Sequence, residues 1–227
     1  MDPARLAFRP AEAPPPGGPR PGLHTLPGGR DGRPTLLYVP ESAGAGARPA
    51  PLAVSLHGAG STGERGLAIL RDHADAAGLA VLAPSSRTAT WDVIAGGFGP
   101  DVAAIDAALA AAATLIAVDP AHLLLAGFSD GASYALSLGL SNGDLFTHLL
   151  AFSPGFAAPA RRQGSPRIFM THGTEDRVLP IDRCSRRLAP RLRDGGYDVD
   201  YREFDGGHVV PGDLAAAAVG WALADRG

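Results

Sequence analysis

The chain has 227 residues, of which 45% are hydrophobic and 19% are charged, and its net charge is −3. This length and composition suit one globular domain and argue against extended disorder. No block of like charges indicates a nucleic-acid surface or a polybasic membrane patch. The single cysteine, Cys184, cannot close an internal disulfide.

Residues 1–22 contain seven prolines, which lack the amide donor that regular structure needs. We therefore expect a proline-rich N-terminal arm, irregular or mobile, ahead of a single domain over residues 23–227. The first residues lack the apolar segment of a signal peptide, and no apolar run is long enough to span a membrane. These features predict a cytoplasmic protein without a membrane span.

After residue 34, short apolar runs alternate with longer helical patterns. Strands are predicted at 35–39, 52–56, 80–82, 123–126, 149–152, 167–171 and 199–204. Helices are predicted at 64–77, 101–117, 130–140, 181–195 and 212–225. Most of the strands are apolar on both faces, as strands buried between two helical layers should be. The alternation predicts an α/β fold with a mostly parallel sheet flanked by helices on both faces.

Ser129 lies between a predicted strand and a predicted helix, in the sequence Gly127-Phe128-Ser129-Asp130-Gly131. A serine at a sharp strand-to-helix turn has a strained backbone that lifts its hydroxyl clear of the sheet, and flanking glycines leave room for that turn. The helix that follows directs amide groups toward developing negative charge. Ser133, one helical turn further on, is expected to bond to the backbone instead. The pattern predicts Ser129 as a nucleophile.

A serine nucleophile needs a base, and in this kind of fold the acid and then the histidine follow the serine in the chain. His208 stands in a glycine-rich loop after the last predicted strand. His148 and His172 stand at strand ends, where a histidine more often packs or bonds to the backbone. We therefore predict His208 as the base.

The acid should follow the penultimate strand and precede the histidine. Two adjacent carboxylates, Glu175 and Asp176, come just after the predicted strand at 167–171. Neighbouring side chains on a turn point apart, so only one of them can reach the imidazole. We predict Asp176 as the acid and a solvated Glu175.

A tetrahedral intermediate needs two amide donors for its oxyanion. The amide of Asp130 and that of Ala59, in the glycine turn after the strand at 52–56, are the predicted pair, with His57 holding the turn. The same turn also reads as Gly-x-Gly-x-x-Gly, but no acidic residue ends a following strand as a dinucleotide site requires. No metal or organic cofactor is implied.

Two aromatic residues are candidates for the substrate pocket. Phe128 adjoins the nucleophile, and Trp91 lies in the long connection over residues 85–100, where it either walls the pocket or packs in the core. The Asp130 side chain either suits the helix start or disfavours anionic substrates.

Four segments resemble the phospholipase/carboxylesterase branch of the α/β-hydrolases over roughly residues 35–225. They are Leu56-His57-Gly58-Ala59-Gly60, Gly127-Phe128-Ser129-Asp130-Gly131, His172-Gly173-Thr174-Glu175-Asp176 and Gly207-His208. The family more often has glutamine where this chain has Asp130. The resemblance implies the fold and the Ser-Asp-His triad. It leaves the substrate open, because the family includes esterases, lysophospholipases and acyl-protein thioesterases.

The leading hypothesis is a serine carboxylesterase that acts on small carboxylic esters through an acyl-enzyme. A thioesterase or lysophospholipase with the same triad is the alternative, and a non-catalytic hydrolase fold that binds a ligand is the hypothesis from another class. The predicted strands at 149–152 and 167–171 are joined by residues 153–166, which are too few for a cap domain of two helices. We therefore expect an open site that prefers short acyl groups.

Overall fold

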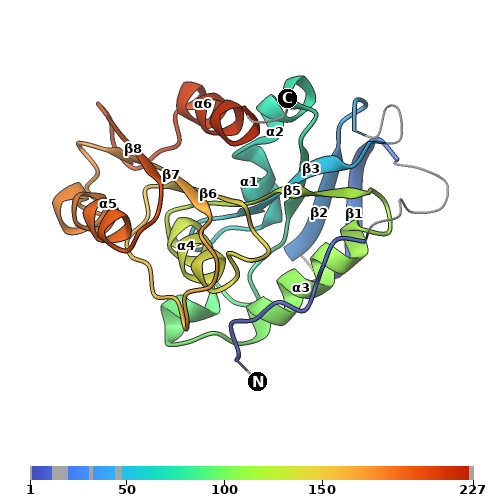
Figure 1. Cartoon of the computed structure of the whole chain (residues 1–227), viewed down its shortest axis with the longest axis horizontal. Coiled ribbons are helices and arrows are strands. Elements are labelled where there is room, and N and C mark those ends of the chain that lie inside the picture. Colours follow the sequence, from blue (N-terminus) through green and yellow to red (C-terminus); the bar gives the residue numbers. More distant parts are fainter. Residues whose placement is uncertain (1, 12–19, 31–32, 44–47, 225–227) are drawn as a thin grey trace.

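The computed structural model describes residues 2–11, 20–30, 33–43 and 48–224. Within these residues, eight strands form one sheet in the order β1-β2-β4-β3-β5-β6-β7-β8 (Figure 1). The strands are β1 Gly22–Arg30, β2 Arg33–Val39, β3 Ala50–Leu56, β4 Ala80–Ala83, β5 Val118–Phe128, β6 His148–Phe152, β7 Arg167–Gly173 and β8 Val199–Phe204. Strand β2 pairs antiparallel with β1 and with β4, and every other neighbouring pair is parallel. The prediction of a mostly parallel sheet is confirmed.

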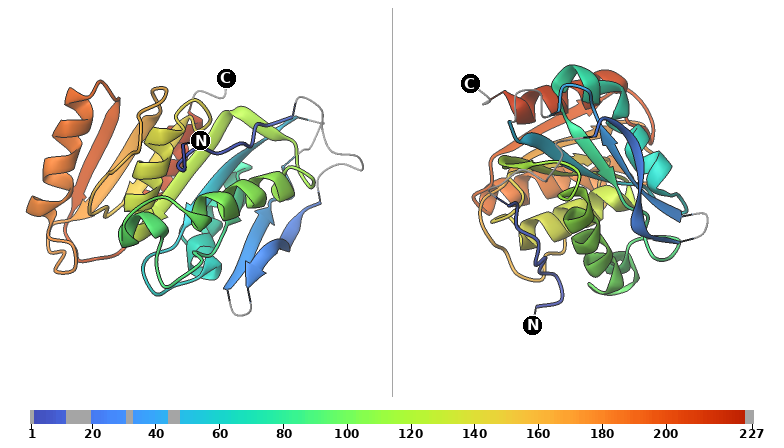
Figure 2. Two further views of the ribbon diagram at one scale, coloured as in Figure 1. Left: turned by 90° about the horizontal axis from the view of Figure 1, so that it is seen from below. Right: turned by 90° about the vertical axis from the view of Figure 1, so that its right-hand side faces the viewer.

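Helices cover both faces of the sheet. They are α1 Gly63–Ala68, α2 Arg71–Ala77, α3 Pro100–Ala112, α4 Asp130–Ser141, α5 Ser185–Asp194 and α6 Gly212–Leu223. Helices α1, α2 and α6 pack in one apolar cluster, and α3, α4 and α5 pack in another on the opposite face (Figure 1). The strands run side by side between these layers, from β1 at one edge to β8 at the other (Figure 2). The predicted arrangement of helices on both faces is confirmed.

Each central strand contributes side chains to both apolar clusters, because successive side chains of a strand point to opposite faces of the sheet. Leu123 and Leu125 of β5 belong to the α4 side, whereas Leu124 and Ala126 belong to the α6 side. All four side chains are fully buried. The continuous apolar run that identified this strand in the sequence is thus required by two buried faces.

Three predicted helices differ from those observed. The pattern over 64–77 forms two helices, because Leu70 leaves helical geometry and is fully buried between them. The helix expected over 101–117 ends at Ala112. The pattern over 181–195 begins with a short 3₁₀ turn, η3 (Ile181–Arg183), and breaks at Cys184 before α5 starts.

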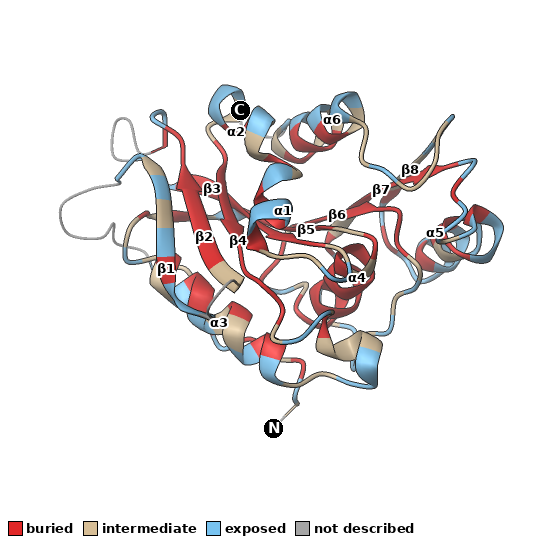
Figure 3. Ribbon diagram, turned by 180° about the vertical axis from the view of Figure 1, so that it is seen from behind, coloured by how far each residue is buried: buried red, intermediate tan, exposed pale blue. Residues whose placement is uncertain are grey.

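Strand β1 was not among the predicted strands. Its sequence, GLHTLPGGR, lacks a sustained apolar alternation and contains proline and glycine, which are poor strand formers. It is an edge strand whose pairing with β2 shifts register between Leu26 and Arg30. Only one of its faces needs apolar residues, so the periodic signal is weak, as the mixed burial in Figure 3 shows.

The first residues of the expected proline-rich arm dock against the domain. Leu6 and Phe8 are buried in the core, and the amide of Leu6 donates to Oδ1 of Asn142 at 3.0 Å. The Asn142 side chain in turn donates to the carbonyl of Ala4 at 2.7 Å. Residues 2–11 are therefore an irregular but packed segment, and residues 12–19 of the arm lie outside the described part of the chain.

Strand β6 leads into β7 through residues 153–166, which contain no helix. The site that follows the carboxyl ends of the strands is therefore not covered by an insertion at this point. In the described part of the chain, no helix combines the length and the apolar character needed to cross a membrane.

Candidate active site

Ser129 occupies a strained turn between β5 and α4. Its φ of 58° and ψ of −120° lie in a region that L-residues rarely adopt. The turn is held by the Ser129 amide, which donates to the carbonyl of Phe152 at 2.9 Å. A Cβ on Gly127 would stand 2.3 Å from the carbonyl oxygen of Gly131, and one on Gly131 would stand 2.3 Å from that of Leu56. Both flanking glycines are thus required by close backbone packing.

The loop after β8 brings His208 to the serine. His208 Nε2 lies 2.8 Å from Ser129 Oγ, and Nδ1 lies 2.6 Å from Oδ2 of Asp176. Since an ionised carboxylate only accepts, Nδ1 carries the ring proton and Nε2 can accept from the serine hydroxyl. The Phe128 ring packs against the imidazole with centroids 4.6 Å apart. The three predicted residues therefore form one hydrogen-bonded chain.

The loop after β7 fixes the carboxylate. Oδ1 of Asp176 accepts from the amides of Val178 and Leu179 at 2.9 and 2.8 Å. Burial acts to raise the pKa of Asp176, but the bonds from His208 and from these two amides outweigh it, so the pKa lies below its ordinary value. The adjacent Glu175 is exposed. The side chain that faces the imidazole is that of Asp176.

The acid loop and the base loop touch through their backbones. The amide of Glu175 donates to the carbonyl of Gly206 at 2.9 Å. A Cβ on Gly173 would stand 2.3 Å from that same Gly206 oxygen and 2.4 Å from the Gly207 oxygen. This contact sets the relative position of Asp176 and His208.

His57 holds the glycine turn that follows β3. Its Nε2 accepts from the amide of Ser86 at 3.0 Å, so its Nδ1 carries the proton that reaches the Gly58 carbonyl at 2.7 Å. Burial lowers the pKa of His57, which favours this neutral form. A Cβ on Gly58 would stand 3.4 Å from the Cβ of Ser129, so the turn lies directly against the nucleophile.

Asp130 directly follows Ser129 in the chain, and Ala59 follows Gly58 in the glycine turn. Among the described residues, neither amide donates a hydrogen bond to another group. The Asp130 side chain points elsewhere and accepts from the Thr90 hydroxyl at 2.6 Å. That bond ties the long connection over 85–100 to the helix start.

The structure separates the two aromatic candidates for the pocket. Trp91 is 1% exposed, packs between His57 and Tyr134, and donates from Nε1 to the His57 carbonyl at 2.8 Å. Trp91 therefore packs in the core against the glycine turn and does not line the substrate pocket. Phe128, in contrast, is partly exposed and lines a groove.

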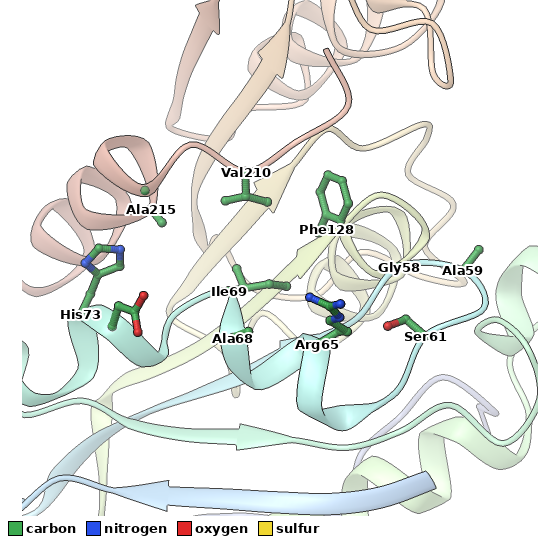
Figure 4. A pocket seen from close by; sticks show the side chains of 12 residues that line it. Gly58, Ala59, Ser61, Arg65, Ala68, Ile69, His73, Phe128, Val210 and Ala215 are labelled. Atoms are coloured by element: carbon green, nitrogen blue, oxygen red, sulfur yellow. The ribbon is translucent and has the colours of Figure 1, made fainter. Parts of the chain in front are cut away.

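This groove lies between α1–α2 and the start of α6, and Gly58, one of its lining residues, packs against Ser129. Its volume is about 440 Å³, and its lining includes Gly58 and Ala59 at the end near the serine (Figure 4). Ile69 and Val210 form apolar walls, and Arg65 also lines the groove (Figure 4). His73 lies at the far end (Figure 4), and its neighbour Asp72 belongs to the same lining. No periodic pattern in the sequence marks this lining, because its residues come from three separate segments.

A second histidine, which sequence reasoning treated as structural, also contacts the acid. His172 Nε2 lies 3.2 Å from Asp176 Oδ2 and 2.8 Å from the carbonyl of Leu179, and the Ser185 hydroxyl bonds to Nδ1 at 2.7 Å. The carbonyl can only accept, so Nε2 carries the proton. Burial is the main cause that lowers the pKa of His172, which keeps the ring neutral. The His172-Gly173 pair before the acid was the only signal for this contact.

No group of three or more histidine, cysteine, aspartate or glutamate side chains in the described ranges could hold a metal ion. The chemistry that the site offers is proton transfer from a serine hydroxyl to an imidazole oriented by a carboxylate.

No family model matches the chain, and no curated protein matches its sequence. Several solved structures are similar. Esterase PE8 has a TM-score of 0.65 and 26% sequence identity, over 88% of this chain and 97% of that chain. S-formylglutathione hydrolase (FrmB) from Staphylococcus aureus has a TM-score of 0.68 and 14% identity, over 84% and 92% of the two chains. SOBER1 from Arabidopsis thaliana has a TM-score of 0.61 and 17% identity, over 78% and 100%.

The sheet order, the helical layers and these neighbours show an α/β-hydrolase fold. The likeness to esterase PE8, at 26% identity, supports the assignment of the chain as a serine hydrolase.

Proposed function

We propose that this α/β-hydrolase chain is a serine carboxylesterase that hydrolyses small carboxylic esters through an acyl-enzyme on Ser129. The observation that carries the proposal is the unbroken set of hydrogen bonds from Ser129 Oγ through His208 to Asp176. A hydroxyl within 2.8 Å of an imidazole nitrogen can transfer its proton as it attacks a carbonyl.

In the proposed reaction, Ser129 Oγ bonds to the ester carbonyl carbon while His208 Nε2 takes the hydroxyl proton. The carbonyl oxygen becomes an oxyanion, for which the amides of Ala59 and Asp130 are the proposed donors. Collapse of the intermediate breaks the bond to the alcohol oxygen, which leaves with the proton from His208. Water then repeats the sequence on the acyl-enzyme and releases the acid.

The groove beside Phe128 is the proposed site for the acyl group. Ile69 and Val210 give it apolar surface. Polar side chains of α1 and α2, at Arg65, Asp72 and His73, interrupt that surface. Burial of a methylene is worth about 0.8 kcal/mol only where apolar surface covers it. Chains beyond about six carbons should therefore gain little, since they meet polar groups or solvent.

A panel of p-nitrophenyl esters from acetate to palmitate tests this proposal, with matched thioesters and a lysophospholipid as comparison arms. We expect ester turnover that is abolished in Ser129→Ala, with kcat/KM highest for acyl groups of about two to six carbons. Ester turnover that persists in folded Ser129→Ala would contradict the assignment of Ser129 as the nucleophile. A kcat/KM that rises steadily to palmitate would contradict the short groove, and a strong preference for the thioester or lysophospholipid would contradict the substrate class.

A further inference from the structure

A second pocket lies on the other side of the molecule from the groove, between the β6–β7 connection and α5. Its volume is about 270 Å³, and none of its lining residues is shared with the groove. Figure 1 shows α4 and α5 on the same side of the sheet, with the β6–β7 connection passing between them. Four of the lining residues are arginines: Arg162, Arg183, Arg187 and Arg191.

No carboxylate in the described part of the chain pairs with any of these four guanidinium groups. Among the ion pairs of the described residues, none involves any of the four, and Arg162 only lies over the Tyr197 ring, at 5.7 Å. The neighbouring Arg186 differs, because it pairs with Asp182 and with Glu203. All four arginines are exposed, as the outward side of α5 in Figure 3 illustrates.

Clustered like charges repel one another, and the net charge of −3 shows that this cluster does not follow from a generally basic chain. An anion in the pocket would remove that repulsion. Guanidinium groups offer paired N–H donors that match the oxygens of a phosphate, and several arginines together favour a dianion.

The rest of the lining is apolar. Leu188 and Leu192 come from α5, and Phe156, whose side chain is 37% exposed, comes from the β6–β7 connection. A cavity of about 150 Å³ is sufficient for benzene. A pocket of 270 Å³ therefore has room for one ring together with a charged group, but not for a nucleotide-sized ligand.

We propose that this pocket is a second binding site, which takes a small phosphate monoester whose apolar group is about the size of one ring. The phosphate lies among Arg162, Arg183, Arg187 and Arg191, and the apolar group packs on Phe156 and Leu188.

The test is isothermal titration calorimetry of the full-length protein with phenyl phosphate. Benzoate, a monoanion with a ring of the same size, is the comparison ligand. We expect phenyl phosphate to bind more tightly than benzoate, and Arg187→Gln and Arg183→Gln each to weaken it about tenfold, as the loss of one charge-assisted bond should. Arg186→Gln is the matched control on the same helix, and it should leave the affinity unchanged because that guanidinium is already paired. Phe156→Ala should weaken phenyl phosphate but leave inorganic phosphate unaffected.

Three results would overturn the site. The first is the absence of binding at millimolar phenyl phosphate. The second is an affinity that responds equally to Arg186→Gln and Arg187→Gln. The third is tighter binding of benzoate than of phenyl phosphate. Vesicles containing phosphatidic acid form a separate arm, in which vesicle binding without phenyl phosphate binding would assign the arginines to a lipid surface and contradict a pocket for a small ligand.

Discussion

Two histidines share one oxygen of Asp176. Oδ2 lies 2.6 Å from Nδ1 of His208 and 3.2 Å from Nε2 of His172, and both side chains that approach it carry a proton on the facing nitrogen. The carboxylate is thus held by hydrogen bonds from two imidazole rings, that of the base His208 and that of the buried His172.

The acid itself gives the first prediction. Asp176→Asn should lower kcat by about 10⁴-fold at neutral pH, because an amide can no longer stabilise the proton that His208 receives. Glu175→Gln is the matched control, since that side chain is exposed and adjacent. Steady-state kinetics on a p-nitrophenyl ester compare the two. If Glu175→Gln proves the damaging change, the assignment of the acid is wrong.

The second prediction concerns His172 as a positioning residue. In His172→Leu the carboxylate loses the donor on Oδ2, because leucine has no N–H group, so it should stabilise protonated His208 more strongly. The acidic limb of the kcat/KM profile should therefore move to higher pH, with KM little changed. Ser185→Ala, which removes only the partner of Nδ1, should shift the limb less. A uniform loss of activity at every pH would indicate a purely structural role.

Much of this site could be anticipated from local sequence. Ser129 and Asp176 come after buried strands, β5 and β7, whose apolar runs are visible in the chain. His208 follows the partly exposed strand β8 and was predicted from its glycine-rich loop after the last strand. The structure brings the three side chains together. The contact between Leu6 and Asn142 spans 136 residues, so no local pattern encodes it. Trp91 illustrates the same limit. The sequence around a tryptophan in a long connection is the same whether its side chain packs in the core or lines a pocket.

The third prediction concerns the two glycines that flank Ser129, Gly127 and Gly131. Gly131→Ala would force a Cβ to within 2.3 Å of the Leu56 carbonyl oxygen, so the strand or the helix must move. Overpacking of this kind costs about 1–3 kcal/mol or more, and urea unfolding should show it as a lower midpoint. Gly212→Ala is the control, because a Cβ there meets nothing within 4 Å. An equal midpoint for the two variants would contradict the steric account of the motif.

The fourth prediction is a loss of stability in mild acid. Burial lowers the pKa values of His57 and His172 from the ordinary value of 6.5. Below that value the unfolded chain takes up protons that the folded chain refuses, so the free energy of unfolding should fall as pH decreases from about 7.5 to 5.5. Urea unfolding at several pH values measures the slope. His172→Gln should flatten it, and a slope unchanged by that substitution would exclude His172 as a contributor.

Covalent labelling of the intact protein with a fluorophosphonate, followed by mass spectrometry of its peptides, tests whether Ser129 is the nucleophile. We expect one modified residue, Ser129, and slow labelling in His208→Ala, because the hydroxyl then lacks its base. Ser133→Ala, one turn away, should label at the wild-type rate. Modification at another serine, or unchanged labelling in Ser129→Ala, would contradict the assignment of the nucleophile.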